Sequence, residues 1–385
     1  MAEIYKLRNK FKHYEWGSKT MMPEFLNIDN KKASPYAEMW MGNNRGAPSQ
    51  VCLNGDRDSG DLKDLIEVSG ELPFLFKLLA VEKPLSIQAH PDKKQAQAGF
   101  KKEEESMLSM NAPTRNYKDD NHKPEIFCAL SDTALMAGFK EPDEIRESFT
   151  ELLFLLPVLN EIVAPFIGIL KTGSLSQFFR MLCYISRLEQ EYLCSFIKEI
   201  DVNNTGETCK VISCDQWKLI KKFAKLYPSD PAILSPLYLN YIKLTPGQAV
   251  YIPAGVLHAY LSGFGLEVMA NSDNVLRGGL TPKHVDTGEL MNILQFNPFK
   301  PDIITPPDNA SSFDYHTSCG EFLLVFMRGE QEFKKDGPAI CFITKGELKI
   351  DNLIFRKGDS FFIPKGSAAV SFKGNYSLYA ACHNM

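Results

Sequence analysis

A motif of glycine and proline occurs twice in this chain and constrains the fold more than any other feature. Residues 247–255 and residues 358–366 both read G-x5-P-x-G, with a short run of strand-forming residues before the proline. His258 follows the first copy by three residues, whereas Ala369 occupies the same place after the second copy. The repeat predicts two related β units, of which only the first keeps a histidine suited to bind a metal.

The repeated motif resembles the second signature motif of cupins, which are small double-sheet β barrels of the jelly-roll type. The resemblance predicts a mainly β fold with a metal-binding barrel over residues 1–140 and 236–305, and a metal-free barrel over residues 306–385. Residues 141–235 instead show helical spacing and few turn residues, in the stretches 143–156, 174–200 and 213–227. We therefore expect a helical subdomain inserted into the first barrel.

Four residues from three separate segments are of the kinds that bind zinc. If residues 84–92 form a strand, Ser86, Gln88 and His90 share one face, because side chains alternate along a strand. Glu125 lies in a His-Lys-Pro-Glu segment, and His258 closes the first copy of the repeat. Two histidines with a carboxylate are a recurrent metal-binding set. We predict one zinc ion per chain, with the neutral amide of Gln88 as an unusual fourth ligand.

The segment that follows His258 carries further charged residues. Arg277 precedes two glycines, which let backbone approach a ligand closely, and with Lys283 it could neutralise a phosphate or a developing oxyanion. Glu267 stands among apolar neighbours, where a carboxylate is costly unless it is paired. A salt bridge to a buried cation and a catalytic role explain Glu267 equally well. Residues 258–270 themselves read as a hairpin with a Gly-Phe-Gly turn.

Other polar residues near the predicted ligands have two interpretations each. Lys77 lies in a very apolar run, so its ammonium either reaches solvent or enters a polar cavity. Lys123 shares strand parity with Glu125 and is expected to face the metal, whereas His122 has the opposite parity and needs a bend before Pro124. Trp16 could line a sugar pocket, and packing in the core explains a tryptophan equally well.

Six motifs, met in order along residues 1–300, together resemble type I mannose-6-phosphate isomerases. They are Y-E-W-G at 14–17, A-E-M-W-M-G at 37–42, S-I-Q-A-H-P-D at 86–92, H-K-P-E at 122–125, Y-I-P-A-G-V-L-H-A-Y at 251–260 and N-S-D-N-V-L-R-G-G-L-T-P-K at 271–283. The resemblance implies an aldose-ketose isomerase that interconverts mannose 6-phosphate and fructose 6-phosphate with zinc bound by the four residues above.

The family resemblance also implies roles for individual residues. The catalytic arginine corresponds to Arg277, and residues for phosphate binding or proton handling correspond to Lys77, Ser86, His122, Lys123, Asp273 and Lys283. The base that moves a proton between C1 and C2 is left open. Glu267, Lys123, Asp273 and a zinc-bound water all remain candidates.

Composition limits the partners and the compartment of the protein. A formal charge of −4 and a pI near 6.0 over 385 residues give no support for a nucleic-acid partner. The N-terminus lacks the apolar core of a signal peptide, and no apolar run is long enough to span a membrane. Nine scattered cysteines without a CxxC pair fit reduced thiols. Together with the family resemblance, which implies a small phosphorylated hexose as the partner, we expect a cytoplasmic monomer.

Two other functions compete with the isomerase. An iron-dependent cupin oxygenase would use the same two histidines and carboxylate, but it does not account for Gln88 or for the nearby cations. A non-catalytic sugar-phosphate binder would be expected to lack a ligand or Arg277, and the sequence has all of them. Metal analysis with oxygen uptake tests the first alternative, and binding without turnover would favour the second.

Overall fold

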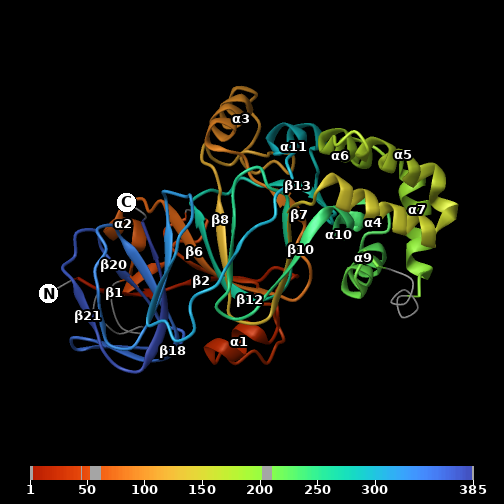
Figure 1. The fold of residues 1–385 in the computed structure, drawn as a ribbon. Coiled ribbons are helices and arrows are strands. Elements are labelled where there is room, and N and C mark those ends of the chain that lie inside the picture. The colour runs from red at the N-terminus through yellow and green to blue at the C-terminus, as the bar shows by residue number, and fades with distance from the viewer. Residues whose placement is uncertain (1–2, 45, 53–61, 202–209, 384–385) are drawn as a thin grey trace.

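The computed structural model describes residues 3–44, 46–52, 62–201 and 210–383, and its strands form two large β-sheets (Figure 1). The C-terminal strands lie at one end of the molecule, a long sheet occupies the middle, and a group of helices lies at the other end. The prediction of a mainly β fold is therefore confirmed.

The central sheet has eleven strands and carries the predicted metal ligands. Its strands are β2 (Lys10–Lys12), β3 (Glu38–Met41), β6 (Phe74–Val81), β7 (Ile87–Ala89), β8 (Glu125–Ala129), β9 (Thr133–Phe139), β10 (Leu239–Leu244), β11 (Ala249–Ile252), β12 (His258–Ala270), β13 (Leu276–Gly279) and β14 (Ile303–Ile304). Strand β6 is buried along its whole length, as its apolar residues favour, and Lys77 is the one charged residue within it.

The longest strand of this sheet corrects one prediction. Residues 258–270 form the single strand β12, so the hairpin with a Gly-Phe-Gly turn is wrong. The first half of β12 pairs with β7 and β9, and the second half pairs with β6 and β8. Gly265 serves close packing, because a Cβ there would lie 2.4 Å from Cζ of Phe127. Gly263 has a φ of 122°, which lets the strand bend where it changes partners.

The second sheet joins the two ends of the chain. It contains β1 (Tyr5–Arg8), β4 (Gln50–Cys52), β5 (Leu62–Asp64), β15 (Ser312–Tyr315), β16 (Leu323–Arg328), β18 (Ala339–Ile350), β19 (Leu353–Arg356), β20 (Ser360–Ile363) and β22 (Tyr376–Cys382), and a separate pair is formed by β17 (Gln331–Phe333) and β21 (Val370–Phe372). Strand β1 pairs with β20, which comes from the second copy of the repeat. The N-terminal strands thus complete the sheet of the C-terminal strands.

Helices interrupt the central sheet between β9 and β10, and we call residues 142–238 the helical region. Its helices within the described residues are α4 (Pro142–Leu155), η1 (Pro157–Leu159), α5 (Asn160–Leu170), α6 (Leu175–Cys183), α7 (Arg187–Glu199), α9 (Cys214–Leu226), η2 (Pro231–Leu234) and α10 (Ser235–Tyr238). Phe149, Phe166 and Phe178 meet edge to face in its core, with centroids 5.4–5.9 Å apart. In the described ranges no single helix is long and apolar enough to span a membrane. Helix α4 together with η1 and α5 has the required length and composition, but the two halves are bent by 118°.

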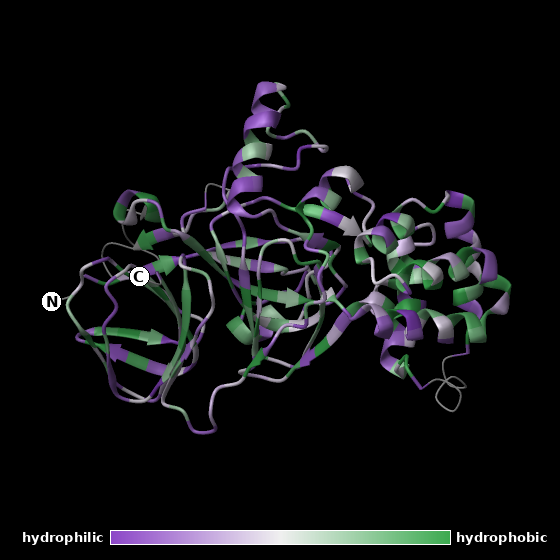
Figure 2. Ribbon diagram, turned by 45° about the horizontal axis from the view of Figure 1, so that its top comes forward, coloured by the Kyte–Doolittle hydropathy of each residue, from purple (hydrophilic) through white to green (hydrophobic). Residues whose placement is uncertain are grey.

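The expected helices are only partly matched. Stretches 143–156 and 213–227 correspond to α4 and α9, but 174–200 is divided into α6 and α7, because Ser186 begins a new helix with a capping box. The remaining helices lie outside this region: α1 (Met21–Leu26), α2 (Leu65–Ser69), α3 (Lys93–Glu105) and α11 (Thr287–Ile293). Helix α3 projects from the body of the molecule and is largely hydrophilic (Figure 2).

Candidate metal centre and active-site cavity

Neighbouring strands of the central sheet bring the predicted metal ligands together. His90 Nε2 lies 3.2 Å from Glu125 Oε1, and His258 Nε2 lies 3.4 Å from Glu125 Oε2. All three side chains are buried, and one ligand atom of each lies within 4.8 Å of the others. The amide of Gln88 approaches His258 Nε2 at 3.3 Å, and a flip of that amide would present its oxygen instead.

Strand register explains part of this convergence. His258 at the start of β12 pairs with Gln88 of β7, and Gln88 also pairs with Arg277 of β13. Glu125 at the start of β8 pairs with Met269 at the other end of β12. Register therefore places Gln88 beside His258 and Arg277, whereas Glu125 reaches the two histidines from another part of the sheet.

The electrostatics of the centre fit a divalent cation. His90 Nε2 is buried and finds no hydrogen-bond partner among the described residues, which is costly unless something else satisfies it, and the buried Glu125 Oε1 beside it contacts the ammonium of Lys123 at 2.9 Å. Burial and the ammonium of Lys123 lower the pKa of His90 to about 4, so the imidazole is neutral, as a metal ligand must be. Burial opposes the charge on Glu125, but the ammonium of Lys123, 2.9 Å away, outweighs it and holds the pKa of Glu125 well below its usual range.

Backbone carbonyls fix the orientation of both imidazoles. His90 Nδ1 lies 2.7 Å from the carbonyl oxygen of Asn274, and His258 Nδ1 lies 3.0 Å from that of Val256. Because a carbonyl oxygen only accepts, each Nδ1 carries the proton and donates it. Each Nε2 therefore turns its lone pair toward Glu125, which is the arrangement of a metal-binding histidine.

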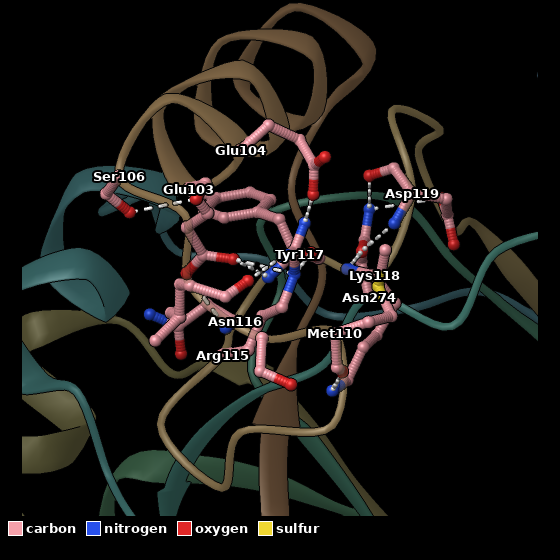
Figure 3. A network of polar contacts seen from close by, with 12 residues as sticks. Glu103, Glu104, Ser106, Met110, Arg115, Asn116, Tyr117, Lys118, Asp119 and Asn274 are labelled. Atoms are coloured by element: carbon pink, nitrogen blue, oxygen red, sulfur yellow. Dashed lines mark hydrogen bonds and ion pairs between the residues drawn. The ribbon is translucent and has the colours of Figure 1, made fainter.

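Asn274 connects this orientation to the segment that follows α3 (Figure 3). Its Oδ1 accepts from the backbone N–H of Lys118 at 2.6 Å and that of Asp119 at 3.2 Å, and its Nδ2 donates to the carbonyl oxygens of Asp119 and Asn121 at 2.8 Å. Arg115 fastens the same segment to α3 through Glu104. The sequence placed Asn274 in a motif but offered no signal for this role.

A cavity of about 740 Å³ opens beside the metal centre, which is ample for a hexose phosphate. Two predicted metal ligands line it, Gln88 and Glu125, and so do the following residues predicted for substrate or catalysis: Trp16, Lys77, Ser86, Lys123, Glu267, Asp273, Arg277 and Lys283. Burial lowers the pKa of Arg277, and burial together with Arg277 lowers the pKa of Lys283. Two neighbouring, partly desolvated cations form an attractive site for an anion.

Lys77 and Glu267 form a buried ion pair at the wall of this cavity. They face each other across β6 and β12, and Lys77 Nζ lies 2.9 Å from Glu267 Oε2. Burial disfavours the ammonium of Lys77, but Glu267 and Glu38 outweigh that effect and raise its pKa. The salt bridge that the sequence left open for Glu267 is therefore present, and both groups still line the cavity.

The structure does not bring every predicted residue to the cavity, and it adds others. His122 is not among the residues that line it, and its Nε2 contacts the carboxylate of Glu321 just before β16. Tyr260, which was not singled out, donates to Glu125 Oε2 at 3.3 Å from inside the cavity. Tyr227 of the helical region also lines the cavity, and only the packing of the helices could show this.

The fold is mainly β, and its buried centre of two histidines and a carboxylate opens to a cavity rich in cations. These features define a metalloenzyme that acts on a small anionic substrate. The model for the phosphomannose isomerase type I catalytic domain matches residues 4–142. The chain is 36% identical to the mannose-6-phosphate isomerase of Salmonella typhimurium, over 97% of this chain and 98% of the relative. The chain belongs to the type I phosphomannose isomerase family.

Other relatives and solved structures agree over the whole length. The mannose-6-phosphate isomerase of Escherichia coli is 35% identical, over 97% of this chain and 98% of its own. A crystal structure of the Salmonella typhimurium enzyme bound to its substrate and a zinc atom superposes with a TM-score of 0.87 at 32% identity, covering 100% of both chains. A zinc-bound holo structure of a mannose 6-phosphate isomerase gives 0.87 at 33% identity, again over 100% of both.

Proposed function

We propose that this protein interconverts D-mannose 6-phosphate and D-fructose 6-phosphate with one zinc ion held by His90, Glu125 and His258. Gln88 is the fourth ligand, through its amide oxygen. One observation carries the proposal. Two buried imidazoles, oriented by backbone carbonyls, face one carboxylate, and the cavity beside them is lined by Arg277. Relatives named as this isomerase over nearly the full chain support it.

The reaction needs groups that place the sugar and stabilise charge. Zinc, when bound, would act as a Lewis acid that polarises sugar oxygens. Arg277 supplies fixed positive charge for the enediolate that forms as a proton moves between C1 and C2. Lys283, next to Arg277 in the cavity wall, binds the phosphate and so places the reacting carbons.

Three side chains in the cavity remain candidates for the proton transfer. Glu267 is paired with Lys77 at 2.9 Å, and Lys123 is held near the metal centre by Glu125, also at 2.9 Å. Asp273 lies in the cavity wall on the loop before β13. Replacing each in turn, and measuring exchange of the C2 proton with solvent separately from binding, identifies the base.

The fold we propose for this activity is a pair of cupin barrels with an inserted helical subdomain. The ligand strands β7, β8 and β12 belong to the first barrel, and the helical region interrupts it between β9 and β10. In the second barrel the interior is filled by apolar side chains such as Phe361 and Phe372, and Ala369 stands where the first barrel has its histidine. The second barrel therefore has a structural role. As a separate part of the proposal, the protein acts as a cytoplasmic monomer.

A coupled isomerase assay with and without a chelator tests the function. We expect turnover of fructose 6-phosphate that a chelator abolishes and zinc restores. His258→Ala should lose both bound zinc and activity, because it removes a ligand that is completely buried. Tight binding of mannose 6-phosphate by the zinc-loaded protein without turnover would favour a binding protein, and oxygen consumption with bound iron would favour an oxygenase.

A further inference from the structure

The helical region reaches the active-site cavity at one turn, residues 227–230, which follows α9. Tyr227 lines the cavity, and the backbone N–H of Asp230 donates to the carbonyl oxygen of Tyr227 at 3.3 Å. Asp230 is not itself among the lining residues, yet its carboxylate is mostly buried. Such a carboxylate needs strong partners, and these partners show what it does.

Both oxygens of Asp230 accept hydrogen bonds from backbone. Oδ1 accepts from the N–H of Ala232 at 2.9 Å, within the start of η2, and Oδ2 accepts from the N–H of Leu280 at 2.6 Å. The N–H of Thr281 is a further donor. One carboxylate therefore joins the helical region to residues 277–283, which comprise the end of β13 and the loop that follows it.

That segment has a backbone shape that needs external support. Gly279 has a φ of 124° and Leu280 a φ of 53°, and leucine rarely adopts a left-handed conformation. The ladder between β13 and β7 also slips in register between Arg277 and Gly279. A Cβ on Gly279 would lie 2.3 Å from Cβ of Ala232, so the segment sits directly against η2.

The two ends of this segment carry the cations of the cavity. Arg277 precedes the strained residues by two positions, and Lys283 follows them by three. We propose that Asp230 is a positioning residue through which the helical region sets Arg277 and Lys283 for the phosphorylated substrate. The inference rests on the proposed isomerase function and extends it, because it assigns the helical region a part in substrate binding.

Asp230→Asn in the zinc-loaded protein is the direct test. An amide of the same shape loses the charge, and its NH₂ group would face a backbone donor that the carboxylate now satisfies. We expect kcat/KM for fructose 6-phosphate to fall roughly 10- to 100-fold, with a raised KM and unchanged zinc content. Asp215→Asn is the matched control, because Asp215 lies in the same helical region, is about half exposed and is paired with Lys243. The kinetics of this variant should match those of the parent.

A purely structural role for Asp230 predicts a different result. In that case Asp230→Asn would lower the melting temperature but leave kcat and KM per bound zinc at the parent values, and this result would overturn the proposal. Gly279→Ala provides a second variant that leaves the carboxylate intact. Its methyl group would push the segment away from Ala232, and we expect it to weaken substrate binding in the same direction.

Inorganic phosphate separates this inference from the proposed function, because its binding needs no turnover. We expect phosphate to bind the parent protein about 10-fold more tightly than it binds the Asp230→Asn variant, as measured by calorimetry. An inactive parent with this difference intact would reject the isomerase function and keep the positioning role. Equal phosphate affinity in the two proteins, or no phosphate binding by the parent, would overturn the positioning role.

Discussion

Breaking the buried pair of Lys77 and Glu267 should destabilise the protein strongly. The two side chains are 6% and 3% exposed, so water cannot compensate a charge that loses its partner. Lys77→Met leaves the Glu267 carboxylate unpaired and near Glu125, and removing one partner of a buried pair costs about 3–5 kcal/mol. Lys77 Nζ also lies 5.2 Å from the centre of the Trp40 ring, a contact worth ~0.5–1 kcal/mol.

The cost of this change can be measured by thermal unfolding of the zinc-loaded protein. A domain of about 150–250 residues loses about 2–4 °C of melting temperature per kcal/mol, so the melting temperature should fall by roughly 10 °C. The matched control is Lys31→Met, because the pair of Lys31 and Asp29 is well exposed at 86% and 66% and should contribute less than about 1 kcal/mol.

A double mutant decides whether the pair itself is responsible. Lys77→Met combined with Glu267→Gln removes both charges, so it should cost less than the sum of the single changes by about 2–3 kcal/mol. If Lys77→Met is no more harmful than Lys31→Met, or if the two single changes add, the reasoning from burial is refuted.

Three further predictions concern Arg277, Asn274 and Lys140. Arg277→Ala should keep its zinc but lower kcat about 10²- to 10³-fold, and full activity would discard the role of Arg277. Asn274→Ala should weaken zinc binding about 10-fold in a chelator competition. The side chain of Asn274 binds residues 118–121 and so holds in place the backbone carbonyl that orients His90, and an unchanged zinc affinity would refute this role. Burial lowers the pKa of Lys140 from 10.5 to about 8, so the unfolded chain holds this proton to higher pH than the folded protein does. The free energy of unfolding should therefore rise between pH 8 and 10.5, by up to about 3 kcal/mol relative to that of Lys140→Met. Urea titrations at each pH measure this difference, and parallel pH profiles for the two proteins would contradict the prediction.

The metal centre could be predicted from the sequence because metal chemistry restricts the residues. Few side chains bind zinc, and His90, Glu125 and His258 each lie in a short segment with distinctive neighbours. The alternation of side chains along β7 then placed Gln88 on the same face as His90. The structure brings His90, Glu125 and His258 together, with the amide of Gln88 beside His258.

Contacts between distant segments could not be predicted in the same way. The glycines of β12 look like a turn in the sequence, but they serve close packing against Phe127 and a bend beside Thr133. Helix α5 is apolar on most faces and contains Pro165, so its spacing gives a weak helical signal. Asn274 and Asp230 act through backbone groups of segments about 155 and 50 residues away, and neither partner has a sequence signature.

Anomalous diffraction at the zinc absorption edge tests the metal centre most directly, on crystals of active protein. We predict one zinc peak per chain, about 2.0–2.2 Å from Nε2 of His90, Nε2 of His258 and a carboxylate oxygen of Glu125. A zinc peak at any other place, or full isomerase activity in crystals without a peak beside these three side chains, would contradict the account.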